Sequence, residues 1–240
     1  MPVASEAESS GAVPGTPERI DERDILAEPR WPVAVAISTF IAISVVLRVT
    51  LPNRESLGPH WLVPGIEFGL LVCLVAADPA HLAHRRRWLR RIAIALVFAL
   101  AVATLVATGV LIRDLIVGGK VTNEASTLLA SGALIWLGNV LVFSLVYWLL
   151  DSGGPVARYL GERPYPDFAF SQQLSPELAP PGWHAKYVDY LILGLTTSTA
   201  FSPTDVMPMA AWAKLTMALQ SIISLTVVGL VIARAVNVFS

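Results

Sequence analysis

Hydroxyl and carboxylate side chains gather in the stretch LTTSTAFSPTDVMP, residues 195–208, which lies between two hydrophobic segments near the C-terminus. Oxygen atoms of this kind bind cations, and Pro203 breaks the regular backbone among them. Irregular backbone at membrane depth is tolerated only inside protein or beside water. We therefore interpret the stretch as a candidate ion pathway, made of Thr196, Thr197, Thr199, Ala200, Phe201, Ser202, Pro203, Thr204 and Asp205.

The composition indicates that this pathway would lie in a membrane. Of the 240 residues, 55% are hydrophobic and only 15% are charged. A soluble domain of this size cannot bury so much apolar surface, so we predict a polytopic membrane protein. The net charge of −1 gives no reason to expect a nucleic-acid partner, and the single cysteine, Cys73, excludes an internal disulfide. Arginine far outnumbers lysine, which suits a GC-rich bacterial genome, so we expect the bacterial inner (plasma) membrane.

Five segments are apolar enough to be membrane helices. A helix needs about 20 apolar residues to cross roughly 30 Å of hydrocarbon. None of the segments alternates between apolar and polar residues as a strand does, so we predict an all-α fold with about five transmembrane helices. The segments are residues 31–47, 61–77, 92–112, 128–150 and 215–233.

The chain divides into four regions by composition. Residues 1–30 are polar and acidic, without the apolar core of a signal peptide, and predict a disordered tail. Residues 31–150 would hold four transmembrane helices, and residues 151–186 form a polar linker rich in Gly and Pro. The apolar run that begins the last region, residues 187–236, is too short to span. It therefore predicts a short re-entrant pore helix and loop before the final helix.

Polar groups inside the apolar segments suggest function or helix association. Glu67 is the clearest intramembrane acid, whereas Arg113 and Asp114 are placed to mark a helix end at the interface. Asn139 and Gln220 are predicted to hydrogen-bond between helices.

The basic run HRRRWLRR, residues 84–91, abuts a predicted membrane helix and is typical of the cytoplasmic side. His81 and His84 have the spacing of helical metal ligands, but the neighbouring arginines would repel a cation, so we predict no metal site. Nothing in the sequence combines a nucleophile, a base and an orienting group, and no glycine-rich phosphate loop is present. We therefore expect neither an enzyme nor a bound cofactor.

Residues 187–236 resemble the pore domain of potassium channels. That family has an aspartate, an apolar pore helix with threonines, the filter TVGYG and a second aspartate before its inner helix. Asp189 stands sixteen residues before Asp205, as in the common pattern, and Thr197 and Thr199 match the pore-helix threonines. The remaining matches are Pro208, Trp212, Lys214 and Leu215 before and at the start of the inner helix, and Gly229, Leu230 and Val231 further along it.

The resemblance implies an oligomeric pore in the lipid bilayer, which we expect to be a tetramer that passes monovalent cations. The filter positions hold AFSPT and lack both glycines, whose permissive backbone angles the family's filter needs. A weakly selective channel is therefore expected. The implied ligands are Asp205 at the mouth with Thr199, Ser202 and Thr204, and the implied cavity lining is Gln220 and Ser224.

The sequence leaves alternatives open for both the membrane topology and the function. The potassium-channel orientation would place HRRRWLRR outside, against the positive-inside rule, whereas the inverted orientation resembles glutamate-receptor pores. Residues 187–201 could instead form a sixth spanning helix, which would leave a membrane protein or transporter without a pore loop. A further alternative is a non-conducting scaffold or sensor subunit that retains a pore-like fold.

Overall fold

The computed structural model describes residues 31–50, 65, 69, 85–117, 125–199 and 206–239. The predicted span 61–77, the acid Glu67, the acidic tail and the central residues 200–205 of the candidate ion pathway lie outside these described residues, apart from positions 65 and 69.

Long helices make up most of the described chain, as the sequence predicts. They are α2 (Trp31–Thr50), α4 (Arg85–Val117), α5 (Ala125–Leu150) and α9 (Ala211–Phe239). Within the described residues, three apolar helices are long enough to cross a membrane, namely Arg90–Arg113, Ser126–Gly153 and Ala211–Val236, and Trp31–Leu47 is a shorter apolar helix. The predicted segments 92–112, 128–150 and 215–233 are therefore confirmed as helices of spanning length.

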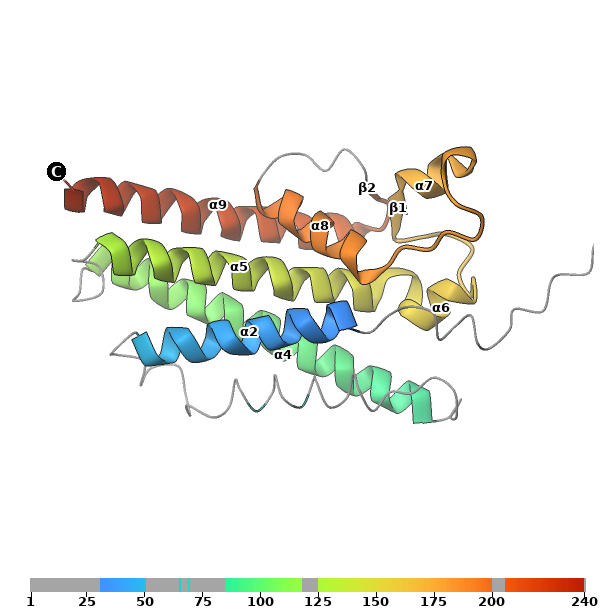
Figure 1. Ribbon diagram of the computed structural model, residues 1–240, viewed down its shortest axis with the longest axis horizontal. Coiled ribbons are helices and arrows are strands. Elements are labelled where there is room, and N and C mark those ends of the chain that lie inside the picture. Colours follow the sequence, from blue (N-terminus) through green and yellow to red (C-terminus); the bar gives the residue numbers. More distant parts are fainter. Residues whose placement is uncertain are drawn as a thin grey trace, which may run out of the picture.

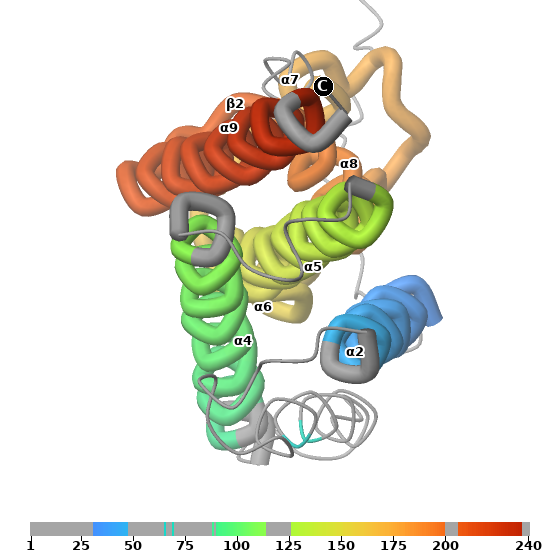
Figure 2. The backbone as a smooth tube through the Cα atoms, turned by 90° about the vertical axis from the view of Figure 1, so that its left-hand side faces the viewer, coloured from blue at the N-terminus to red at the C-terminus, as the bar shows by residue number. Residues whose placement is uncertain are grey.

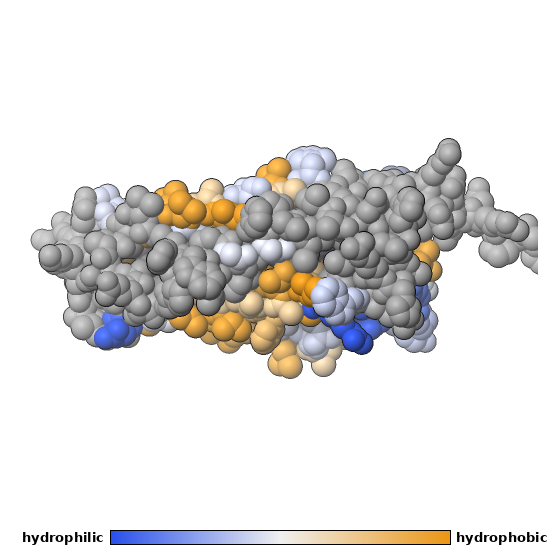
Figure 3. Space-filling model, turned by 90° about the horizontal axis from the view of Figure 1, so that it is seen from below, coloured by the Kyte–Doolittle hydropathy of each residue, from blue (hydrophilic) through white to orange (hydrophobic). Residues whose placement is uncertain are grey.

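Helix α5 lies at the centre of the molecule, where it contacts α2, α4, α8 (Tyr187–Ser198) and α9 (Figures 1 and 2). Its share of buried residues, 67%, far exceeds the 28% of the α4 span and the 33% of the α9 span. Large side chains on these outer helices are exposed, including Phe98, Leu215 and Ile222. Figure 3 shows apolar side chains over the middle of one face and hydrophilic ones near its two ends. This distribution suits helices whose outer surfaces face lipid.

Residues 151–186, predicted as a linker, form an ordered layer at the C-terminal end of α5. We call this layer, together with β2 (Val206–Pro208), the cap. It contains η3 (Asp151–Gly153), α6 (Pro155–Tyr159), β1 (Phe168–Phe170), α7 (Ser171–Leu174) and η4 (Pro176–Leu178). The sequence SGG turns the chain out of α5 through three consecutive residues with positive φ, at Ser152, Gly153 and Gly154, a conformation that favours glycine.

Aromatic packing explains why the cap is ordered. Strands β1 and β2 pair antiparallel, with Ala169 opposite Met207. The Phe168 ring lies edge-on to Tyr147, at 5.2 Å between centroids, and to Trp212, at 5.6 Å. Phe170 lies 5.2 Å from the Tyr190 ring. These rings join the cap to α5, α8 and α9, so the segment that follows α5 folds back onto the membrane helices.

Candidate functional site

Helix α8 reaches only part of the way along the helix layer. Its twelve residues extend about 18 Å, whereas the hydrocarbon core is roughly 30 Å thick. The helix begins beside the cap, where the Tyr190 hydroxyl donates a hydrogen bond to Asp151. It ends against Gln220, the tenth residue of α9, and the next described strand, β2, pairs with β1 back in the cap (Figure 1). The chain therefore leaves the cap in α8 and is in the cap again at Val206.

The first turn of α8 is closed by Asp189, the aspartate that begins the predicted pore motif. Its Oδ2 accepts a hydrogen bond from the backbone N–H of Lys186 at 2.7 Å, which caps the helix N-terminus. Tyr187, in the same turn, shares a 2.9 Å hydrogen bond with the Ser144 hydroxyl on α5. These contacts fix the position at which α8 leaves the cap.

Gln220 joins the end of α8 to α9 and α5. Its side chain is fully buried, and its Nε2 donates to the Gly194 carbonyl at 2.9 Å and to the Ser198 hydroxyl at 2.7 Å. Its Oε1 accepts from the Tyr147 hydroxyl at 2.6 Å. Since one amide on α9 satisfies groups from both α5 and α8, it sets the depth at which α8 ends. We call Tyr147, Gly194, Ser198 and Gln220 the amide cluster.

Glycine 194 allows α8 to approach α5 closely. A Cβ at this position would lie 3.1 Å from the Val140 carbonyl oxygen and 3.3 Å from the Cβ of Ser144. The neighbouring carbonyls of α8 also have partners, because the Ser221 hydroxyl donates to the Thr197 carbonyl at 3.1 Å. The Trp136 indole donates to the Ser198 carbonyl at 3.4 Å. The C-terminal half of α8 is therefore held by both α5 and α9.

The threonines of the predicted ion pathway differ in their surroundings. Thr196 is half-buried and Thr199 is exposed, and their hydroxyls donate to carbonyls of α8 itself. Thr197 is buried, and within the described chain its hydroxyl oxygen has no hydrogen-bond partner. The other predicted members, Ala200, Phe201, Ser202, Pro203, Thr204 and Asp205, lie outside the described residues.

The residues predicted to line an inner cavity, Gln220 and Ser224, are both buried within the single chain. Ser224 accepts a 2.8 Å hydrogen bond from Asn139 on α5. The alternative prediction, that Asn139 and Gln220 hydrogen-bond between helices, is confirmed. The reason is register: both α9 side chains point to the face that packs against α5 and α8.

Of the remaining residues of the predicted pore scaffold, Pro208, Trp212 and Lys214 lie at or just before the start of α9, and Gly229 lies further along it. Pro208 is paired with Phe168 in the small sheet, and Trp212 packs on the same ring. Lys214 is exposed in the first turns of α9. Gly229 is also exposed, and a Cβ there would meet nothing within 4 Å, so its backbone serves no close contact in the single chain.

Asp151 is a structural centre that the sequence did not reveal. It is 1% exposed, and its Oδ1 accepts from the backbone N–H groups of Asp167 and Phe168, each at 3.2 Å. Arg158 lies 3.8 Å from Oδ2 and 4.9 Å from the centre of the Tyr190 ring. An acid immediately after an apolar run normally indicates an interface. Apart from the adjacent Ser152, the partners of the Asp151 carboxylate come from residues 7 to 39 positions away, which the local sequence pattern does not disclose.

His184 is the cap residue whose titration is perturbed. Partial burial, and after it the positive charges of Arg158 and Lys186, lower the pKa of this imidazole below its ordinary value. The ring also lies 4.8 Å from Tyr159. Within the described ranges, no three His, Cys, Asp or Glu side chains come together as metal ligands.

No protein-family description, curated protein or solved structure matches this chain.

Proposed function

We propose that this chain forms an oligomeric cation pathway in a membrane, built from α5, α8 and α9, with the loop after α8 at the pore axis. The observation that carries the proposal is the half-length helix α8, which leaves the cap, ends beside Gln220 and is followed by a strand in the cap. A helix that goes part of the way in and a chain that returns to the same end form a re-entrant loop. Such backbone needs a protein interior or water around it.

Electrostatics supports a cation rather than an anion at this depth. The C-terminus of a helix carries about half a negative charge, and α8 directs this end away from the cap into the helix layer. The carbonyls of Gly194, Thr197 and Ser198 are already hydrogen-bonded within the chain. Oxygen ligands would therefore come from Thr199 and Asp205, which match the potassium-channel pattern, and from Ser202 and Thr204, which stand where that pattern has its two glycines.

Oligomerisation is part of the proposal, because a single α8 cannot enclose a pore. The outer face of α9 is apolar and exposed at Leu219, Ile222 and Leu225, and it could face lipid or a neighbouring copy. The pore-domain resemblance implies a tetramer with a monovalent-cation pathway, and the excess of arginine over lysine suits a bacterial inner membrane.

The distribution of arginine and lysine favours the inverted orientation. Arg90 lies against the turn that ends α5, since its Nε would be 3.3 Å from a Cβ at Gly154. Among the basic side chains that the structure describes, Arg90 and Arg91 lie in the first two turns of α4, Lys214 lies in the first turn of α9, and Arg158, Arg163 and Lys186 belong to the cap, whereas Arg113 and Arg234 lie near the C-terminal ends of α4 and α9. Figure 1 shows that α4 and α9 both run away from the cap. By the positive-inside rule the cap is cytoplasmic, and the loop would enter from the cytoplasm. A thiol reagent should label Glu177→Cys, in a Cys73→Ser background, only when it has access to the cytoplasmic face of the membrane.

A non-conducting scaffold is the second candidate, and the amide cluster favours it. Tight hydrogen bonding around Gln220 fixes α8 rigidly, which suits a structural role as well as a pore. The scaffold predicts a folded protein that passes no ions.

Flux through reconstituted protein separates the two candidates. Liposomes with outward K⁺ or Na⁺ gradients should release both ions, and Asp205→Asn should lower the rate because it removes negative charge at the mouth. Glu177→Gln, at an exposed acid of the cap, is the matched control and should conduct as wild type. If folded wild-type protein passes no ions under any gradient, the channel proposal fails and the scaffold remains.

A further inference from the structure

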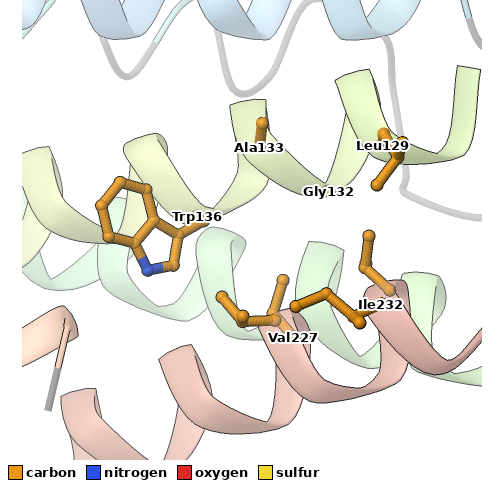
Figure 4. Close-up of a pocket in the computed structure, with 8 residues that line it drawn as sticks. Leu129, Gly132, Ala133, Trp136, Val227 and Ile232 are labelled. Atoms are coloured by element: carbon orange, nitrogen blue, oxygen red, sulfur yellow. The ribbon is translucent and has the colours of Figure 1, made fainter. Parts of the chain in front are cut away.

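An apolar groove runs between α5 and α9 on the side of the molecule away from the cap. Its volume is about 320 Å³, near the lower limit of ligand pockets. Leu129, Ala133 and Trp136 line it from α5, and Val227 and Ile232 line it from α9 (Figure 4). Every lining residue is apolar, so the groove offers dispersion contacts and no hydrogen bonds.

The lining of the groove includes one point of very close contact between the two helices. A Cβ on Gly132 would lie 2.6 Å from Cγ2 of Val231, so the backbone of α5 and this valine are already in close contact. Close approach at a small residue is the usual way in which membrane helices pack.

A single arginine lies just beyond the groove. Arg234 follows Val227 and Val231 at helical spacing, so its Cβ lies on the same face of α9, one turn closer to the C-terminus. In the described part of the chain, its Nε is buried and has no hydrogen-bond partner. A buried guanidinium N–H without an acceptor is costly, which points to an acceptor from outside the chain.

We infer that the groove and Arg234 together bind an anionic phospholipid. One acyl chain would fill the groove, and the headgroup phosphate would accept hydrogen bonds from the guanidinium. The position of Arg234 near the end of the α9 span places it at the level of lipid headgroups. An Arg fork suits a phosphate geometrically, whereas a second copy of the chain would leave the arginine unpaired unless it brought an acid. The inference does not depend on ion conduction.

The indole of Trp136 provides the readout, because it lines the groove. Reconstituted protein would be mixed with phosphatidylglycerol or phosphatidylcholine that carries bromine on the acyl chains, which quenches tryptophan fluorescence on contact. The contribution of Trp136 is the difference between wild type and Trp136→Phe. Phosphatidylglycerol should compete for the groove about fivefold better than phosphatidylcholine, the effect expected of one basic residue.

Two variants and a control decide the result. Arg234→Gln should abolish the preference for phosphatidylglycerol, whereas Arg113→Gln, at an exposed arginine on the same side, should retain it. Ala133→Leu fills the groove at an exposed position and should lower quenching of Trp136 by both lipids. Equal quenching by the two lipids in wild type, or quenching unchanged in Ala133→Leu, would overturn the inference. So would disulfide cross-linking between copies through Ala133→Cys, because a second chain would then occupy the groove.

Discussion

Replacing Gln220 with leucine should loosen α8 from the two long helices. The change keeps a similar volume but removes three buried hydrogen bonds, to Tyr147, Gly194 and Ser198. Hydrogen bonds between membrane helices contribute on average about 0.6 kcal/mol each, which gives about 2 kcal/mol for the three. A buried hydroxyl left without an acceptor at Tyr147 costs about 1–3 kcal/mol more, if it finds no other partner. We expect a loss of about 2–5 kcal/mol in the free energy of unfolding, a factor of roughly thirty or more in the folded population.

The measurement is reversible unfolding in mixed micelles as the SDS fraction rises, followed by circular dichroism. Thr226→Val is a matched control on α9, because its hydroxyl bonds only to a carbonyl of its own helix. Tyr147→Phe combined with Gln220→Leu should cost less than the sum of the two single changes, since both remove the same hydrogen bond. A Gln220→Leu protein within about 0.5 kcal/mol of wild type, the range of ordinary surface changes, would refute the role assigned to the amide cluster.

Three further changes test the cap and the packing of α8. Gly194→Ala should destabilise the protein by about 1–3 kcal/mol through overpacking against α5. The control Gly229→Ala lies in open space and should be neutral or slightly stabilising. Equal effects of the two changes on stability would contradict the close approach of α8 to α5. Asp151→Asn should make the cap sensitive to brief proteolysis, because the backbone N–H groups of Asp167 and Phe168 and the Tyr190 hydroxyl then have weaker acceptors. The control Glu162→Gln, on the exposed surface, should leave the resistance to proteolysis unchanged. The pKa of His184 is lowered, so the unfolded chain takes up its proton more readily than the folded one, and stability should fall as the pH drops below about 6.5. An NMR titration of the imidazole, with His184→Gln to assign the signal, should show protonation below about pH 6.5. A midpoint at or above this pH would contradict the effect assigned to burial and the nearby positive charges.

Local properties of the sequence determined the class of this protein and the places of its long helices. Hydropathy and length are properties of a continuous segment, so the segments 92–112, 128–150 and 215–233 are found without knowing what packs beside them. The rule that a polar side chain in an apolar helix seeks a partner likewise predicted that Asn139 and Gln220 bond between helices. The length of the apolar run that begins at Tyr187 also predicted a helix too short to span.

Tertiary structure alone decided which partners meet. Tyr147 and Gln220 are 73 residues apart, and Asn139 and Ser224 are 85 apart, so no local pattern pairs them. The resemblance placed Gln220 and Ser224 on a cavity, but the register of α9 against α5 turned both inward. Strands of three residues carry too little alternation to be recognised, which is why the cap was taken for a linker. Sequence fixes how apolar each helix is, whereas the depth of α8, the buried Asp151 and the groove beside Arg234 follow from how distant helices pack.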